Sequence, residues 1–171
     1  IFLIQPVFEQ VFDRASTFPY WFATIALLAA SSSYVNARLV RKLGMRMLTS
    51  IAFRAQVCFS ALVFLVYWLG YFEGQFGFFC FLFWMFSIFF QAGLTMGNLT
   101  ALAMEPVGHI AGTAASLVSA IATIGSVLLA AIVGQFFDGT PAAMIAGVAL
   151  FATLGAISSH RLKCYDRASK A

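Results

Sequence analysis

Hydrophobic side chains fall in long blocks separated by short polar connections. Five blocks cover residues 18–35, 47–71, 76–102, 110–136 and 141–159, and a shorter one covers residues 1–8. A helix that crosses a bilayer needs about 20 apolar residues, so the five long blocks predict membrane-spanning helices. The opening block is too short to span, and we interpret it as the end of a truncated helix. The pattern therefore predicts an all-α membrane protein, a six-helix bundle with one truncated helix.

Basic residues gather in two places along the chain. Four lie in the connection of residues 36–46 and four in the C-terminal tail, namely Arg38, Arg41, Lys42 and Arg46, and Arg161, Lys163, Arg167 and Lys170. Lys and Arg accumulate in cytoplasmic loops of membrane proteins. This distribution predicts a cytoplasmic C-terminus and a cytoplasmic 36–46 connection. Counting through the helices puts the connection of residues 103–109 on the same side.

The remaining connections are acidic on balance and are expected outside. They carry Glu9, Asp13, Arg14, Glu73 and Asp138. Aromatic anchors at the ends of membrane helices support the same orientation. They are Tyr20 and Trp21 at the start of one block, and Tyr67, Trp68 and Tyr71 at the end of the next.

The block of residues 76–102 carries a polar stripe. Ser87, Gln91, Thr95 and Asn98 recur at helical spacing and fall within roughly 80° of arc. Amides in hydrocarbon are costly unless they find partners or water. The stripe therefore predicts either a substrate cavity or hydrogen bonds to adjacent helices. Gln91, near mid-membrane, is the stronger cavity candidate, whereas Asn98 lies near the cytoplasmic end. Further pocket candidates are aromatic: Trp84, Phe86 and Phe90.

Small residues predict close helix packing on two faces. Gly93 and Gly97 lie opposite the polar stripe as a GxxxG pair, which lets helix backbones approach closely in lipid. The block of residues 110–136 has a second small face, made of Gly112, Ser116, Ser119, Thr123 and Ser126. Both faces are expected to lie against neighbouring helices.

Composition agrees with the membrane interpretation and excludes other classes. Hydrophobic residues make up 62% of the chain and charged residues 9%, with a mean hydropathy of +0.93. Soluble domains carry about 25% charged residues. The net charge of +4 comes from the basic residues clustered in the 36–46 connection and the tail, as in cytoplasmic loops, so it does not indicate nucleic-acid binding. The three cysteines have no paired spacing. Because no catalytic or metal-binding motif is present, we expect no enzymatic activity, catalytic residue, metal or cofactor.

Arg54 is the basic residue that lies well inside a predicted span. Two interpretations stay open. Its long side chain snorkels to the cytoplasmic interface, or it forms an ion pair with Glu105.

The segment from Gly97 to Ser116 resembles a signature of bacterial major facilitator transporters. In drug/proton antiporters of the Bcr/CflA type, the loop between the tenth and eleventh helices reads roughly Asn-x-x-Ala-Leu-Ala, then Pro, then Ala-Gly-Thr-Ala-Ser. The matching residues here are Asn98, Ala101, Leu102, Ala103, Pro106, Ala111, Gly112, Thr113 and Ser116, with Ala115 inserted before the last. Glu105 and Pro106 belong to this turn motif. The resemblance covers essentially the entire chain.

The connection of residues 36–46 is similar to a degenerate copy of that family's loop motif, Asp-Arg-x-Gly-Arg-Arg. Lys42, Gly44 and Arg46 fit, but Arg41 stands where the acid is expected and Met45 replaces a basic residue. A plain positive-inside anchor explains the same charges, including Arg38.

The resemblance implies the C-terminal half of a twelve-helix fold, with the N-terminal half absent. It implies a bacterial inner-membrane transporter that exports small organic molecules or drugs by alternating access and proton antiport. No Asp or Glu lies in the middle of a span, so a proton-carrying carboxylate is expected in the absent half. Lipid, that half, a small-molecule substrate and protons are the expected partners. Two alternatives remain: a narrow-substrate metabolite transporter of the same fold, and a structural membrane protein without transport.

Overall fold

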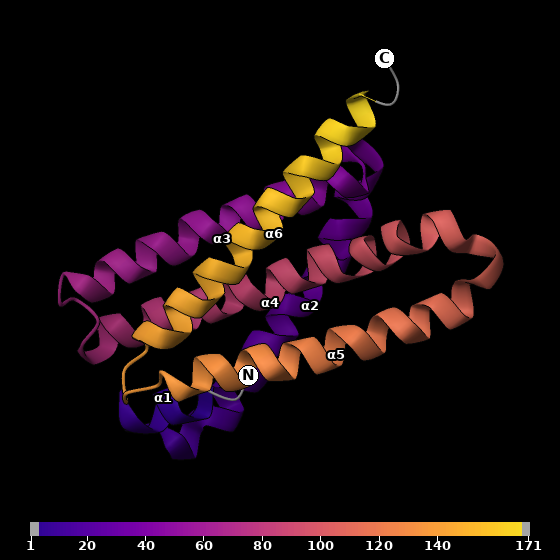
Figure 1. Ribbon diagram of the computed structural model, residues 1–171. Helices are drawn as coiled ribbons and strands as arrows, with labels where there is room; N and C mark the ends of the chain where they lie inside the picture. The colour runs from indigo at the N-terminus through magenta and orange to yellow at the C-terminus, as the bar shows by residue number, and fades with distance from the viewer. Residues whose placement is uncertain (1–3, 169–171) are drawn as a thin grey trace.

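A computed structural model describes residues 4–168, with side chains described through residue 160. Helices form almost all of the described chain, and no strand occurs within it (Figure 1). The long helices are α2 (Phe18–Leu43), α3 (Met45–Trp68), α4 (Gly74–Met104), α5 (Ala111–Gln135) and α6 (Ala142–Ala168). The described chain also contains a short helix, α1 (Ile4–Gln10), and two 3₁₀ turns, η1 (Ala15–Thr17) and η2 (Glu105–Ile110).

Three helical stretches of the described chain are long and apolar enough to cross a membrane. They are Met45–Trp68, Gly74–Gln135, which runs from α4 through η2 into α5, and Ala142–His160. Helix α2 has 26 residues but is not among them, because its tyrosines, serines and basic end lower its hydropathy. These stretches indicate a membrane protein.

The connection predicted at residues 36–46 is much shorter than expected. Helix α2 continues through Leu43, and α3 begins at Met45, so Gly44 alone separates them. Residues such as Ala37, Leu39 and Arg41 are good helix formers, and polarity there marks the end of the apolar face rather than the end of the helix. Gly44 stops α2 because it adopts φ = 78°, a left-handed conformation that favours glycine.

Helices α3 and α6 pack against each other, and α4 packs against both α2 and α3. Gly155 of α6 sits directly on Phe53 of α3, where a Cβ atom would come within 2.7 Å of the ring. Helix α5 contributes no buried residue and runs beside the other helices (Figure 1). The four helices α2, α3, α4 and α6 therefore form the packed unit that positions the candidate site.

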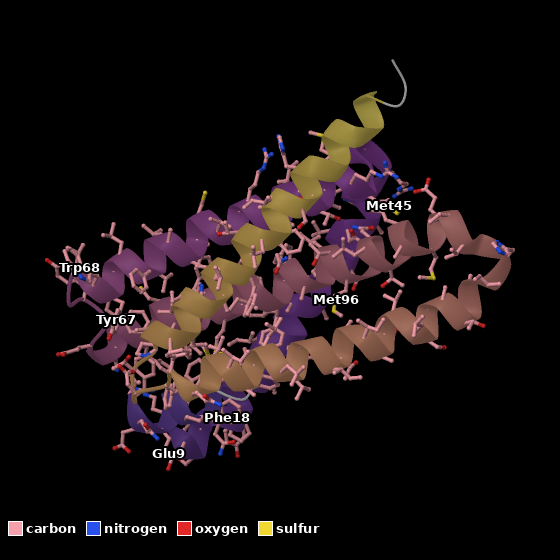
Figure 2. All side chains as sticks on the ribbon, viewed as in Figure 1. Glu9, Phe18, Met45, Tyr67, Trp68 and Met96 are labelled. Atoms are coloured by element: carbon pink, nitrogen blue, oxygen red, sulfur yellow. The ribbon has the colours of Figure 1, made fainter. Side chains whose placement is uncertain are left out.

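The core of this unit is aromatic and lies toward the end that carries α1. Phe8 of α1 and Phe81 of α4 are fully buried, and Phe78 is 1% exposed. The Phe8 and Phe78 rings meet edge to face with centroids 5.6 Å apart, a favoured aromatic geometry. Glu9, Phe18, Tyr67 and Trp68 lie at this end, and Met45 lies at the opposite one (Figure 2).

The α5–α6 turn is organised by a side-chain hydrogen bond. The Asp138 carboxylate accepts hydrogen bonds from the Thr140 hydroxyl (2.6 Å) and the Thr140 backbone N–H (3.1 Å). Both hydrogen bonds lower the pKa of Asp138, and the bond from the Thr140 hydroxyl has the larger effect. The turn sets the start of α6 immediately after the buried Pro141.

Candidate functional site

A cavity of about 270 Å³ lies between α3 and α4, with Leu39 of α2 at its edge. Its wall is mostly apolar. Helix α3 lines it with Leu48, Ile51, Ala52, Ala55, Gln56 and Phe59, and helix α4 lines it with Phe83, Phe86, Ser87, Phe90, Gln91 and Leu94. The three polar lining residues are Gln56, Ser87 and Gln91, so a few polar groups interrupt an apolar wall, as in most small-molecule pockets.

Gln91 and Ser87 are half-buried in this wall, and their helix satisfies most of their polar groups. The Gln91 Nε2 donates to Thr95 Oγ1 at 3.4 Å, and Ser87 Oγ donates to the Trp84 carbonyl at 2.6 Å. Within the described residues the Gln91 amide oxygen accepts no hydrogen bond. It is therefore available as a hydrogen-bond acceptor for a molecule in the cavity.

The predicted polar stripe of α4 divides between two environments. Ser87 and Gln91 line the cavity, but Thr95 and Asn98 are buried between helices at 3% and 5% exposure. Asn98 Nδ2 donates to Asn36 Oδ1 of α2 at 2.8 Å and to the Leu94 carbonyl at 2.7 Å. Asn98 thus joins α4 to α2. The Thr95 hydroxyl instead bonds within its own helix and donates to the Gln91 carbonyl at 2.9 Å.

The aromatic candidates divide in the same way. Phe86 and Phe90 line the cavity, with ring centroids 5.5 Å apart. Trp84 is fully buried at the contact of α4 with α3, where its Nε1 donates to Ser60 Oγ of α3 at 3.0 Å. Trp84 therefore serves helix packing in this structure rather than the cavity wall.

Gln56 is a cavity residue that the sequence analysis missed. It is 3% exposed, and its Nε2 donates to Ser60 Oγ at 3.3 Å. The sequence pattern could have indicated this residue, because Gln56 and Ser60 are polar residues four positions apart, on one helix face, within an apolar block.

The two glycines of α4 lie in different surroundings. A Cβ atom on Gly93 would overlap the Ser32 side chain of α2, so the backbones approach closely there. An equivalent Cβ atom on Gly97 would meet nothing within 4 Å among the described residues. Close packing therefore involves Gly93 and not Gly97.

The small-residue face of α5 is exposed. Gly112, Ser116, Ser119, Thr123 and Ser126 all lie on open surface. The hydroxyls bond back to their own helix: Ser116 to the Gly112 carbonyl at 3.0 Å, Thr123 to that of Ser119 at 2.8 Å and Ser126 to that of Thr123 at 2.9 Å. The face is therefore smooth and has few free polar groups.

The basic residues around Gly44 lie in the last turns of α2 and at the start of α3. Arg41 Nε donates to the Ala37 carbonyl at 3.1 Å, and the Arg38 guanidinium lies 4.5 Å from the centre of the Tyr34 ring. Lys42 is exposed in the last turn of α2. Cations at a helix C-terminus interact favourably with its dipole.

An ion pair links this end to the turn motif. Arg46 Nη2 and Glu105 Oε2 lie 3.2 Å apart, and both side chains are largely exposed, so the pair contributes about 0–1 kcal/mol. Pro106 follows at the start of η2. Since Glu105 pairs with Arg46, the alternative ion pair between Glu105 and Arg54 is not formed, and Arg54 is exposed on α3.

No protein-family model, curated protein or solved structure matches this chain. The chain is a helical protein with stretches long and apolar enough to cross a membrane.

Proposed function

We propose that this chain is the C-terminal six-helix half of a major facilitator transporter that exports small organic molecules across a bacterial inner membrane. The main support for this proposal is the environment of Gln91. This residue is a half-buried amide in the middle of an apolar helix, it lines a cavity, and its oxygen has no partner among the described residues. Polar side chains at membrane depth are costly and commonly mark substrate pathways.

The cavity's chemistry suggests a substrate class. Phe59, Phe86 and Phe90 offer ring faces and edges, and the Gln91 amide oxygen offers one hydrogen-bond acceptor. A flat lipophilic molecule with an N–H or O–H donor complements such a wall. The volume of about 270 Å³ lies just below the range of roughly 300–1,000 Å³ typical of small-molecule pockets, so a second wall from another half would complete it.

The exposed α5 supports the two-halves arrangement. A 25-residue apolar helix without a buried residue, carrying a smooth small-residue face, suits contact with a partner that moves against it during alternating access. Proton antiport rests on the resemblance of the α4–η2–α5 segment alone. The proton-carrying carboxylate would belong to the N-terminal half, because no acid lies mid-span in this chain.

The test is the substrate profile of Gln91→Ala in the full-length protein. We expect altered resistance to some drugs and not others, with nearly normal membrane abundance, because the change removes one ligand contact. Thr100→Ala is the matched control, since this exposed hydroxyl of α4 bonds only to its own helix, at the Met96 carbonyl.

Resistance to several unrelated drugs, normalised to protein level, decides the matter. A uniform loss that tracks abundance would indicate a structural role for Gln91 and would contradict the proposal. A response confined to one metabolite-like compound would instead favour the narrow-substrate transporter.

A further inference from the structure

The amide of Gln56 on α3 is almost completely buried, yet the protein uses only one end of it. The side chain is 3% exposed, and its Nε2 donates to Ser60 Oγ at 3.3 Å. Within the described residues its oxygen accepts no hydrogen bond. Every fully enclosed side-chain nitrogen or oxygen atom of the described chain has a partner, so this oxygen is not enclosed. Because Gln56 lines the cavity between α3 and α4, its oxygen is free at that wall.

Ser60 determines which end of the Gln56 amide faces the protein. Its Oγ also receives a hydrogen bond from Trp84 Nε1 at 3.0 Å. An indole N–H can only donate, and a hydroxyl oxygen has two lone pairs. Both lone pairs are therefore used by N–H donors, one from Trp84 and one from Gln56. The amide nitrogen is held at Ser60, and the amide oxygen is left for the cavity.

The other two polar residues of the cavity wall also direct their donors into the protein. Gln91 Nε2 donates to Thr95 Oγ1 at 3.4 Å, and Ser87 Oγ donates to the Trp84 carbonyl at 2.6 Å. No charged residue lines the cavity among the described residues. Two amide oxygens without partners, one from α3 and one from α4, thus lie in an otherwise apolar wall.

We propose that Gln56 is a second ligand-contacting residue of this cavity, and that Gln56 and Gln91 together select a flat apolar molecule with two N–H donors, such as a primary arylamine. One N–H donates to each amide oxygen, and the ring lies against Phe86 and Phe90, where aromatic pairs add to affinity. A buried acceptor that a ligand leaves unpaired weakens binding, so molecules with fewer donors are disfavoured. This inference rests on the proposed function for its site and adds the number of donors that the ligand needs.

The experiment compares three probes that differ only in their number of N–H groups: aminonaphthalene, its N-methyl derivative and its N,N-dimethyl derivative. Equilibrium dialysis measures their binding to the purified chain in detergent, against empty micelles of the same detergent. We expect each lost N–H to weaken binding roughly fivefold, the effect of one hydrogen bond. Added methyl groups favour transfer into a micelle, so partitioning alone would give the opposite order.

Gln56→Met keeps a long, unbranched side chain and removes the amide. We expect it to abolish one of the two steps, so that the primary and N-methyl amines bind about equally and only the dimethyl compound stays weaker. Gln75→Met is the matched control, because Gln75 is exposed in the first turn of α4, and it should keep both steps. The ratios between probes are taken within one preparation, so they do not depend on the folded fraction. If Gln56→Met does not fold, the order of the probes on the unaltered chain still separates one acceptor from two.

Two unchanged steps in Gln56→Met would overturn the inference. A uniform loss of all three probes in that variant would also overturn it, because Gln56 would then act through packing. A single step on the unaltered chain, abolished by Gln91→Met alone, would overturn the role of Gln56 and leave the Gln91 contact of the proposed function intact. Absence of binding beyond that of empty micelles for every probe would contradict the cavity as a ligand site, and the proposed function with it.

Discussion

At the scale of single residues, a hydroxyl group joins α3 to α4. Ser60 Oγ accepts hydrogen bonds from the Trp84 indole and from the Gln56 amide, and all three side chains are buried. Two donors with a large desolvation cost thus depend on one acceptor. The arrangement fixes the rotation of α4 about its axis, and with it the direction in which Gln91 and Phe90 face.

Replacement of that hydroxyl should destabilise the packed unit. Ser60→Ala leaves both N–H donors without their acceptor, and we expect a loss of about 1 kcal/mol, within the range measured for interhelical hydrogen bonds in membrane proteins. Unfolding by titration with a denaturing detergent measures it. Ser31→Ala is the control, since that exposed hydroxyl bonds only to the Leu28 carbonyl of its own helix. Equal unfolding midpoints for the two variants would show that Ser60 is not a structural acceptor.

At the scale of helices, the contact between α2 and α4 depends on Gly93. The Ser32 side chain occupies the space that a Cβ atom would need, and Asn36, one turn further along α2, receives the hydrogen bond from Asn98. The close approach at Gly93 and Ser32, and the hydrogen bond between Asn98 and Asn36, together set the distance between α2 and α4.

The pair of glycines in α4 offers a matched test of this packing. Gly93→Leu should cost about 1–3 kcal/mol, because added bulk forces α2 away from α4, whereas Gly97→Leu should change stability little in this chain. Thermal denaturation of the two purified variants in detergent compares them. Similar midpoints would mean that α2 and α4 are not in close contact at Gly93.

At the scale of the whole molecule, α5 stands apart from a unit formed by α2, α3, α4 and α6. Its apolar side chains and its small-residue face both lie on open surface. Under the proposed function, this face meets the other half of the transporter.

Substitutions on α5 should therefore act differently in the chain alone and in the full-length protein. Ser119→Leu and Gly112→Leu should leave the stability of this chain unchanged but reduce drug resistance conferred by the full-length transporter, since bulk blocks close approach of the halves. Phe79→Leu, at an exposed site of α4, should be mild in both. Loss of stability in the isolated chain, or full resistance from all three variants, would argue against an interface on this face.

Much of the helical framework followed from the sequence by itself. The apolar blocks predicted the positions of the long helices, and the segment of residues 103–109 was expected as a turn where η2 now lies. Hydropathy and helical period are properties of consecutive residues, so they are readable without a structure. The sequence analysis predicted a connection from residue 36, because polar residues begin there. The structure continues α2 to Leu43, since polar side chains do not interrupt a helical backbone.

Only the tertiary structure decided how the candidate side chains are used. Ser87, Gln91, Thr95 and Asn98 share one arc of α4, yet the first two line a cavity and the last two are buried between helices. That division depends on where α2 and α3 cross α4, and Asn36 and Ser60 lie 62 and 24 residues from their partners. Contacts at such separations are set by the packing of distant segments. A one-dimensional pattern determines which face of a helix is polar, but the neighbours that pack against the helix determine what that face does.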